Sequence, residues 1–165
     1  MNQNNILVGC VEKVVWVRVE GKGSFLNSAG VKEFARAMIS RGYREFVIDL
    51  HHCTVMDSTF MGTLAGVALR LREIGQGTLH VVNWNERNGG LIRNLGLDRL
   101  FVLNLRDIPP LPEDAANPIE TPEDRTAQAH TMLEAHEALV EAAPGNLMKF
   151  KDVLEYLKQD IAEKL

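Results

Sequence analysis

Two short runs near the start of the chain are almost entirely hydrophobic, and both runs are rich in β-branched residues. The runs cover residues 6–10 and 14–19 and flank the polar pair at 12–13, a pattern typical of a β-hairpin. Gly21 and Gly23 follow and are expected to break the second strand. The fold is therefore predicted to open with antiparallel strands.

The hydrophobic period then changes to one typical of a helix. Apolar side chains recur at intervals of three and four, at Val31, Phe34, Ala35, Met38 and Ile39. This spacing predicts an amphipathic helix with Asn27 or Ser28 as its N-cap. Gly42 stands where a left-handed residue commonly ends a helix.

Strand and helix patterns alternate twice more. Residues 45–50 predict an interior strand and residues 60–74 a second helix. A third unit has a strand at 78–82, a helix at 86–95 and a last short strand at 100–103. Together these patterns predict an α/β fold: a mixed β-sheet, with the hairpin followed by parallel strands and helices packed on it.

The chain changes character after residue 105. Prolines among acidic and small residues mark a segment at 106–121 whose composition resists both helix and sheet, which predicts a linker between a domain at 1–105 and a tail at 122–165. Thr121 to Asp124 provides a cap, a first-turn proline and two acids, so a helix is expected from there to about Ala143.

A second helix is predicted after the turn at Pro144-Gly145, so the tail is expected to be a helical hairpin. Its hydrophobic seam consists of Leu147, Phe150, Leu154, Leu157 and Ile161. The seam is expected to close against its own hairpin partner or against the sheet domain. Homo-oligomerisation or partner docking through the tail is the alternative.

The composition of the chain argues against several classes of protein. The chain has 165 residues, 45% of them hydrophobic, and a formal net charge of −4 with scattered charges. A chain of this size can bury a real core, and it lacks the basic face that nucleic acid binding requires. We expect a cytoplasmic protein without membrane insertion, because no apolar run is long enough to cross a bilayer. Two cysteines are too few for a secreted disulfide framework.

Metal chemistry was considered for His51, His52 and Cys53, which follow the strand at 45–50. Adjacent residues on extended backbone point to alternating sides, so at most two of them could reach one ion, whereas zinc takes three or four ligands. The remaining candidates show no ligand spacing: Cys10, His80, His130 and His136. No metal and no other cofactor is therefore predicted.

Ser58 was considered as a catalytic nucleophile. The strained turn that carries a hydrolase serine needs small residues two places before and after it, and this chain has Met56 and Phe60 there. Asp57 adjoins the serine, but no histidine is placed by sequence to act as its base, so only tertiary proximity could supply one. The sequence therefore predicts a protein that is not an enzyme.

Ser58 was also considered as a phosphorylation site. It lies where a loop ends and a helix begins, and the unpaired amides and dipole of a helix start favour a phosphate. Asp57, Ser58 and Thr59 are all favoured N-cap residues, so a purely structural role is equally compatible with the pattern. The local sequence does not decide between a capping role for Ser58 and a role as a phosphorylated switch.

The chain resembles the STAS domain of bacterial anti-sigma factor antagonists over about residues 6–105. The resemblance rests on VEGKGSF, FVIDL, MDSTFMGTL, LHVVNW, ERN and LGLDRLF in this order. The family motif Asp-Ser-Ser/Thr-Gly-Leu-Gly places Asp57 in the acidic position, Ser58 in the phosphoacceptor position and Thr59 in the Ser/Thr position. Gly62 matches the second glycine.

Two positions depart from this motif: Phe60 stands in the usual glycine place and Met61 in the leucine place. A large ring here could fill the core or stand on the partner surface, and both residues are predicted to contact the partner.

The resemblance implies a signalling module without a cofactor, in which Ser58 is phosphorylated by a serine-kinase anti-sigma factor and dephosphorylated by a phosphatase. The unphosphorylated form would bind the kinase, and ATP would belong to that kinase. Similar domains also act without phosphorylation, as scaffolds of stress-signalling complexes or accessory parts of transporters, which is the alternative function.

Overall fold

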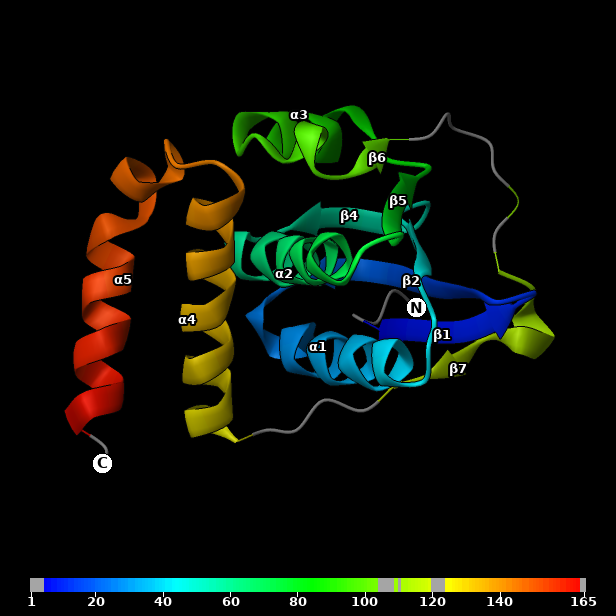
Figure 1. The fold of residues 1–165 in the computed structure, drawn as a ribbon, viewed down its shortest axis with the longest axis horizontal. Helices are drawn as coiled ribbons and strands as arrows, with labels where there is room; N and C mark the ends of the chain where they lie inside the picture. The colour runs from blue at the N-terminus through cyan, green and yellow to red at the C-terminus, as the bar shows by residue number, and fades with distance from the viewer. Residues whose placement is uncertain (1–4, 104–108, 110, 120–123, 164–165) are drawn as a thin grey trace.

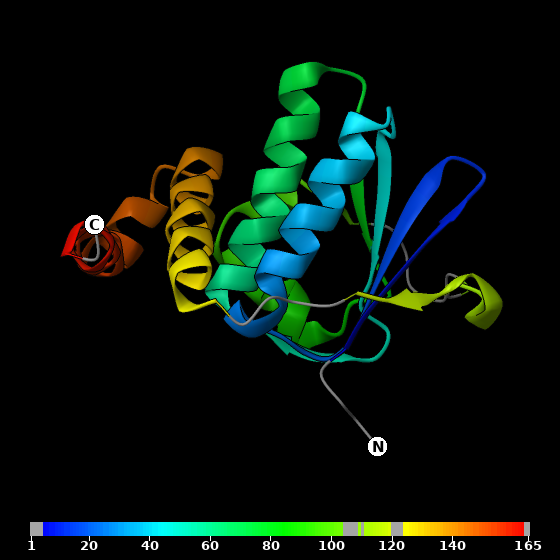
Figure 2. The same ribbon diagram turned by 90° about the horizontal axis from the view of Figure 1, so that it is seen from below.

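A seven-stranded sheet lies at the centre of the described part of the chain, residues 5–103, 109, 111–119 and 124–163 of a computed structural model (Figure 1). The strand order is β6-β5-β3-β2-β1-β7, and β4 pairs with β2 outside this order. Helices α1 and α2 cover one face of the sheet (Figure 2). The predicted α/β fold with a mixed sheet is confirmed.

The predicted hairpin is formed by β1 (Asn5–Val11) and β2 (Val14–Gly23). Its turn residues Glu12 and Lys13 both have positive φ, 50° and 70°, as a type I′ turn requires. The predicted break at the glycines is wrong. From Gly21 to Gly23 the strand is the parallel partner of β4 (Cys53–Met56), and a shift of register between Gly21 and Lys22 makes a bulge without ending the strand.

Three further strands run parallel to β2 across the sheet: β3 (Glu45–Asp49), β5 (Thr78–Val82) and β6 (Val102–Leu103). The first two match the predicted strands and the third is shorter than predicted. Alternate side chains of these strands and β2 form the core under α1 and α2. Those at most 2% exposed are Val15, Val17, Val19, Phe46, Ile48, Leu79 and Val81.

Helix α1 (Phe25–Ser40) begins earlier than predicted. Its N-cap is Ser24, whose hydroxyl accepts from the Leu26 amide, while the side chain of Asn27 accepts from the Ser24 amide at 2.9 Å. The prediction of Asn27 or Ser28 as N-cap is therefore wrong, because Asn27 is the third helical residue of a reciprocal capping pair. Gly42 follows the helix end with φ 95°, as expected.

The other helices of the sheet domain lie close to their predicted places. They are α2 (Ser58–Ile74) and α3 (Glu86–Asn94), and a short 3₁₀ helix that was not predicted, η1 (Leu97–Arg99), follows α3.

The proline-rich segment contains two short elements among its described residues, so the prediction that it avoids helix and sheet is wrong there. They are η2 (Glu113–Ala115) and β7 (Asn117–Pro118), and β7 pairs antiparallel with β1. An edge strand tolerates proline because one side of it needs no donor. The buried Arg18 also holds this segment by donating to the Leu111 carbonyl and pairing with Glu113 at 3.0 Å.

The tail is a helical hairpin, as predicted, made of α4 (Arg125–Ala142) and α5 (Asn146–Glu163). Asp124 caps α4 through its side chain. The other predicted cap residues, 121–123, lie outside the described residues. Helix α4 packs on α1 and α2, and α5 lies on the outer side of α4 (Figures 1 and 2).

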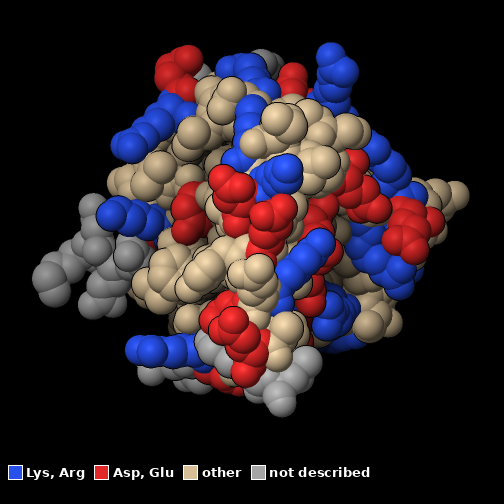
Figure 3. All heavy atoms as spheres, turned by 90° about the vertical axis from the view of Figure 1, so that its left-hand side faces the viewer, with Lys and Arg blue, Asp and Glu red and all other residues tan. Residues whose placement is uncertain are grey.

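The seam of α5 closes against α4, which was one of the two predicted arrangements. Leu154 and Leu157 are 7% and 4% exposed, whereas Leu147 at the helix start remains 46% exposed. The outer surface of the tail carries interspersed acidic and basic side chains, as a surface facing water does (Figure 3).

Candidate functional site at the start of helix α2

One carboxylate holds the start of α2. Asp57 is its N-cap, and Oδ1 accepts from the Phe60 amide at 2.8 Å. Oδ2 accepts from the amide of Phe25 at 2.9 Å, so the same side chain also stabilises the start of α1. Both oxygens of Asp57 are therefore used in holding two helix ends together, and the hydroxyl of the half-buried Ser58 is not needed as a cap.

The Ser58 hydroxyl is instead bonded to the tail. Its Oγ lies 3.0 Å from Nε2 of His136 on α4, and Nδ1 of that ring lies 2.7 Å from the Met132 carbonyl oxygen. A carbonyl only accepts, so Nδ1 carries the proton, and in the neutral ring Nε2 accepts from Ser58. His136 is 3% exposed, and its ring meets Phe150 of α5 edge to face at 5.0 Å between centroids.

This contact supplies the serine–histidine proximity that sequence alone could not. The pair is nonetheless only part of a catalytic triad. A main-chain carbonyl orients His136 where a carboxylate would be expected, and Asp57 is engaged by two helix ends. The hydrogen bond between Ser58 and His136 therefore joins α2 to α4, and the pair has only part of the geometry of a nucleophile and its base.

Thr59 and Gly62 occupy different surroundings from Ser58. Thr59 is 3% exposed, so its side chain lies in the interior, and its carbonyl accepts from the Thr63 hydroxyl at 2.9 Å. Gly62 faces α4, and a Cβ at this position would overlap the carbonyl of Ala135. In this chain, the glycine allows α4 to approach α2 closely.

Phe60 and Met61 are core residues, at 0% and 3% exposed. The Phe60 ring lies over Gly23 of β2, where an added Cβ would come within 2.7 Å of it. The sequence left open whether this ring fills the core or stands on the partner surface, and the structure has it in the core. A partner bound to this surface would touch neither side chain in this conformation.

Exposed apolar side chains beside Ser58 come from the start of α1. Phe25 is 38% exposed and Leu26 is 55% exposed, and the Phe25 amide is bonded to Asp57. Sequence reasoning missed these residues because it placed the N-cap at Asn27 or Ser28. The available signal was Ser24 followed three places later by Asn27, which can form a reciprocal capping pair.

The histidine and cysteine cluster after β3 does not converge. His51 and His52 are exposed and touch each other edge to face, while Cys53 is 3% exposed. Burial raises the pKa of the Cys53 thiol to about 11, which keeps it protonated and a poor nucleophile or metal ligand. Among the described residues, no three His, Cys, Asp or Glu side chains are grouped to hold a metal ion.

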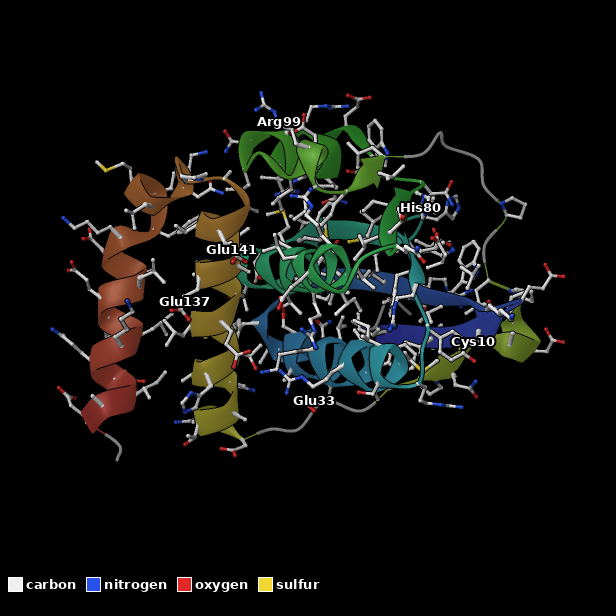
Figure 4. The ribbon with its side chains drawn as sticks, viewed as in Figure 1. Cys10, Glu33, His80, Arg99, Glu137 and Glu141 are labelled. Atoms are coloured by element: carbon white, nitrogen blue, oxygen red, sulfur yellow. The ribbon has the colours of Figure 1, made fainter. Side chains whose placement is uncertain are left out.

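The other predicted ligand candidates lie apart from the start of α2. Cys10 on β1 and His80 on β5 are across the molecule from α4 (Figure 4), and His80 pairs with Glu45 at 3.1 Å. His130 is exposed on α4. Within the described residues, each helix is too short or too polar to span a membrane.

Comparison with known proteins identifies the architecture. A family model of the STAS domain matches residues 5–109. The chain belongs to the STAS domain family. This confirms the resemblance found in the sequence, and the match ends before α4, so His136 lies in an addition to the STAS domain. No curated protein matches the chain.

Solved structures share the STAS fold at low sequence identity. Protein TM1081 from Thermotoga maritima is 20% identical, with a TM-score of 0.55 over 61% of this chain and 85% of that one. An anti-sigma factor antagonist from Mycobacterium paratuberculosis is 24% identical, with a TM-score of 0.52 over 62% and 85%. The anti-sigma factor antagonist SpoIIAA in its unphosphorylated form is 16% identical, with a TM-score of 0.50 over 60% and 87%.

Proposed function

We propose that this STAS protein is a non-enzymatic signalling module of the anti-sigma factor antagonist type, switched by phosphorylation of Ser58. The unphosphorylated form binds a serine-kinase anti-sigma factor, which supplies the ATP, and a phosphatase restores the hydroxyl. The observation that carries the proposal is that Asp57 alone caps the helix, so the half-buried Ser58 hydroxyl has no capping role and is instead bonded to His136 of the tail.

Electrostatics support a switch at this position. A phosphate adds about −1.5 to −2 charges, which the amide end of a helix accommodates well. Here the added charge would stand beside the carboxylate of Asp57, which is fixed in place by two backbone amides. A partner covering this spot would have to bury both negative groups, so phosphorylation opposes binding without unfolding the domain.

The partner surface is assigned to the starts of α1 and α2 around Ser58. Phe25 and Leu26 provide exposed apolar area there, whereas Phe60 and Met61 support the surface from the core. Aromatic and apolar side chains are enriched at the centre of protein interfaces and charged groups are depleted there, so a phosphate added beside these residues opposes binding. The proposed contact residues are therefore Phe25 and Leu26, with Asp57 and Ser58 beside them.

Substitution of Ser58 tests the proposal. Ser58→Asp is expected to weaken binding of the partner captured from native cells at least 100-fold, whereas Ser58→Ala retains binding. Ser40→Asp is the matched control, because it adds the same charge to an exposed serine at the other end of α1. Phosphopeptide mapping of native protein should find phosphate on Ser58 and none on the buried Thr59.

If Ser58→Asp and Ser58→Ala bind the partner equally well and native protein never carries phosphate on Ser58, the switch is refuted. A constitutive STAS scaffold would then be the better description.

A further inference from the structure

Helix α4 approaches α2 through small residues. Gly62 lies against the Ala135 carbonyl so closely that a Cβ would overlap it, and one turn later a Cβ on Gly66 would lie 3.7 Å from that of Ala138. Glycine and alanine allow two helix backbones to come close, but they bury little apolar area. Apart from the fully buried Leu139, the buried side chains of α4 are therefore small or polar and contribute little hydrophobic free energy to this contact.

Two polar contacts fix the middle of α4. His136 accepts from Ser58 at 3.0 Å between Oγ and Nε2, and Glu134 pairs with Lys32 of α1 at 3.1 Å between Nζ and Oε2. Both pairs join the tail to elements of the STAS domain that are far away in the sequence. They place the middle of α4 over the start of α2 and the middle of α1.

Helix α4 does not seal this surface. A cavity of about 440 Å³ lies between α1, α2 and α4, and its lining includes Lys32, Gly66 and Glu134. A helix that borders an open cavity loses few contacts when it moves away. The buried residues of α4 are also mostly small or polar: Ala129, Thr131, Ala135, His136 and Leu139.

We propose that α4 is a built-in cover of the Ser58 site, with His136 as its latch, and that the kinase and the binding partner reach Ser58 only when α4 has lifted. A kinase must bring its catalytic base and the phosphate of ATP within reach of the acceptor hydroxyl, and here the imidazole of His136 already lies at hydrogen-bond distance from that hydroxyl. The inference rests on the proposed function only for the identity of the proteins that are kept out.

The two glycines of α2 provide a matched test of the cover in the full-length protein. Gly62→Ala must push α4 away from the Ala135 carbonyl, whereas Gly66→Ala fits in place at ordinary contact distance. Both changes favour helix, so α2 itself is preserved. Hydrogen–deuterium exchange of α4 amides is expected to be about tenfold faster or more in Gly62→Ala than in Gly66→Ala, because overpacking displaces the weaker element.

A reversible lock tests the consequence for signalling. The Cβ spacing of 3.7 Å suits a disulfide between Gly66→Cys and Ala138→Cys, in a Cys10→Ser background that removes the exposed thiol. In an extract of native cells with ATP, the oxidised variant is expected to receive at least tenfold less phosphate on Ser58 than the same variant after reduction. The Gly66→Cys single variant, treated with the same oxidant, is the control and should be unaffected.

The possible outcomes separate the two proposals. Equal exchange of α4 in Gly62→Ala and Gly66→Ala, with β3 protected in both, overturns the cover and leaves the proposed function intact. Equal phosphorylation of the oxidised and reduced lock also overturns it. If Ser58 receives phosphate in neither form, the proposed function fails, and the exchange comparison alone then decides whether α4 is a cover.

Discussion

At the scale of single residues, the division of roles between Asp57 and Ser58 determines what the site can do. Serine next to aspartate at a helix start normally leaves open which of them is the cap. Here Asp57 accepts one amide from each of two helices, so the cap is assigned without the serine. Ser58 is then bonded to a histidine that belongs to a different part of the chain.

The double role of Asp57 can be measured by substitution. Asp57→Asn retains one acceptor oxygen and can still cap α2, but its amide group cannot accept from Phe25, so we expect a loss of about 1 kcal/mol in the free energy of unfolding. Asp57→Ala loses both contacts and should cost about 2 to 3 kcal/mol. Urea unfolding would check both values, and equal losses for the two variants would argue against a shared cap.

At the scale of elements, the hairpin that opens the fold has an unfavourable turn. Glu12 and Lys13 both adopt left-handed conformations, which Asn-Gly fills more easily than two long side chains. The turn persists because β1 and β2 pair over their full register and β2 is buried on one face. Packing of the strands therefore overrides the local preference at their connection.

Relieving this turn should stabilise the protein. Lys13→Gly removes the penalty of a left-handed side-chain-bearing residue and is expected to raise the free energy of unfolding by about 0.5 to 1 kcal/mol. Lys13→Ala also removes the long side chain but keeps the backbone penalty, so it should bring no comparable gain. Thermal unfolding of both variants measures the difference, and a gain in Lys13→Ala as large as that in Lys13→Gly would exclude the backbone explanation.

At the scale of the whole molecule, one buried amide helps to join the tail hairpin to the STAS domain. Asn146 is 2% exposed, and its Nδ2 donates to the Leu139 carbonyl of α4 at 2.8 Å and to the Leu95 carbonyl after α3 at 2.9 Å. This bond network holds the turn between α4 and α5 at the end of α3. The hydrogen bond between His136 and Ser58 joins α4 to the STAS domain at a second place, one turn before Leu139.

Replacing this amide should loosen the tail. Asn146→Ala removes both hydrogen bonds, although the Leu139 carbonyl still accepts from the Ala143 amide, and is expected to lower the free energy of unfolding by about 1 to 3 kcal/mol. Asn146→Asp should lower it further, because a carboxylate would face two carbonyl oxygens. Urea unfolding with hydrogen exchange in α5 would test this order, and a smaller loss for Asn146→Asp than for Asn146→Ala would contradict it.

The sequence predicted those features whose partners lie close together along the chain. The hairpin, α2 and the strands β3 and β5 follow from local periodicity, because each buries one face of a regular element. The short strands β4 and β7 were missed, since four and two residues carry no readable period and exist only because β2 and β1 offer them hydrogen bonds. The start of α1 was missed because its cap is a reciprocal pair.

The sequence by itself determined the STAS fold, the helical hairpin tail and the position of Ser58 at a helix start. Only the tertiary structure decided that Phe60 and Met61 belong to the core, that Phe25 and Leu26 stand exposed beside Ser58, and that His136 of α4 is hydrogen-bonded to Ser58. The physical reason is distance along the chain: His136 follows Ser58 by 78 residues, and no local pattern encodes which surface a distant helix will cover.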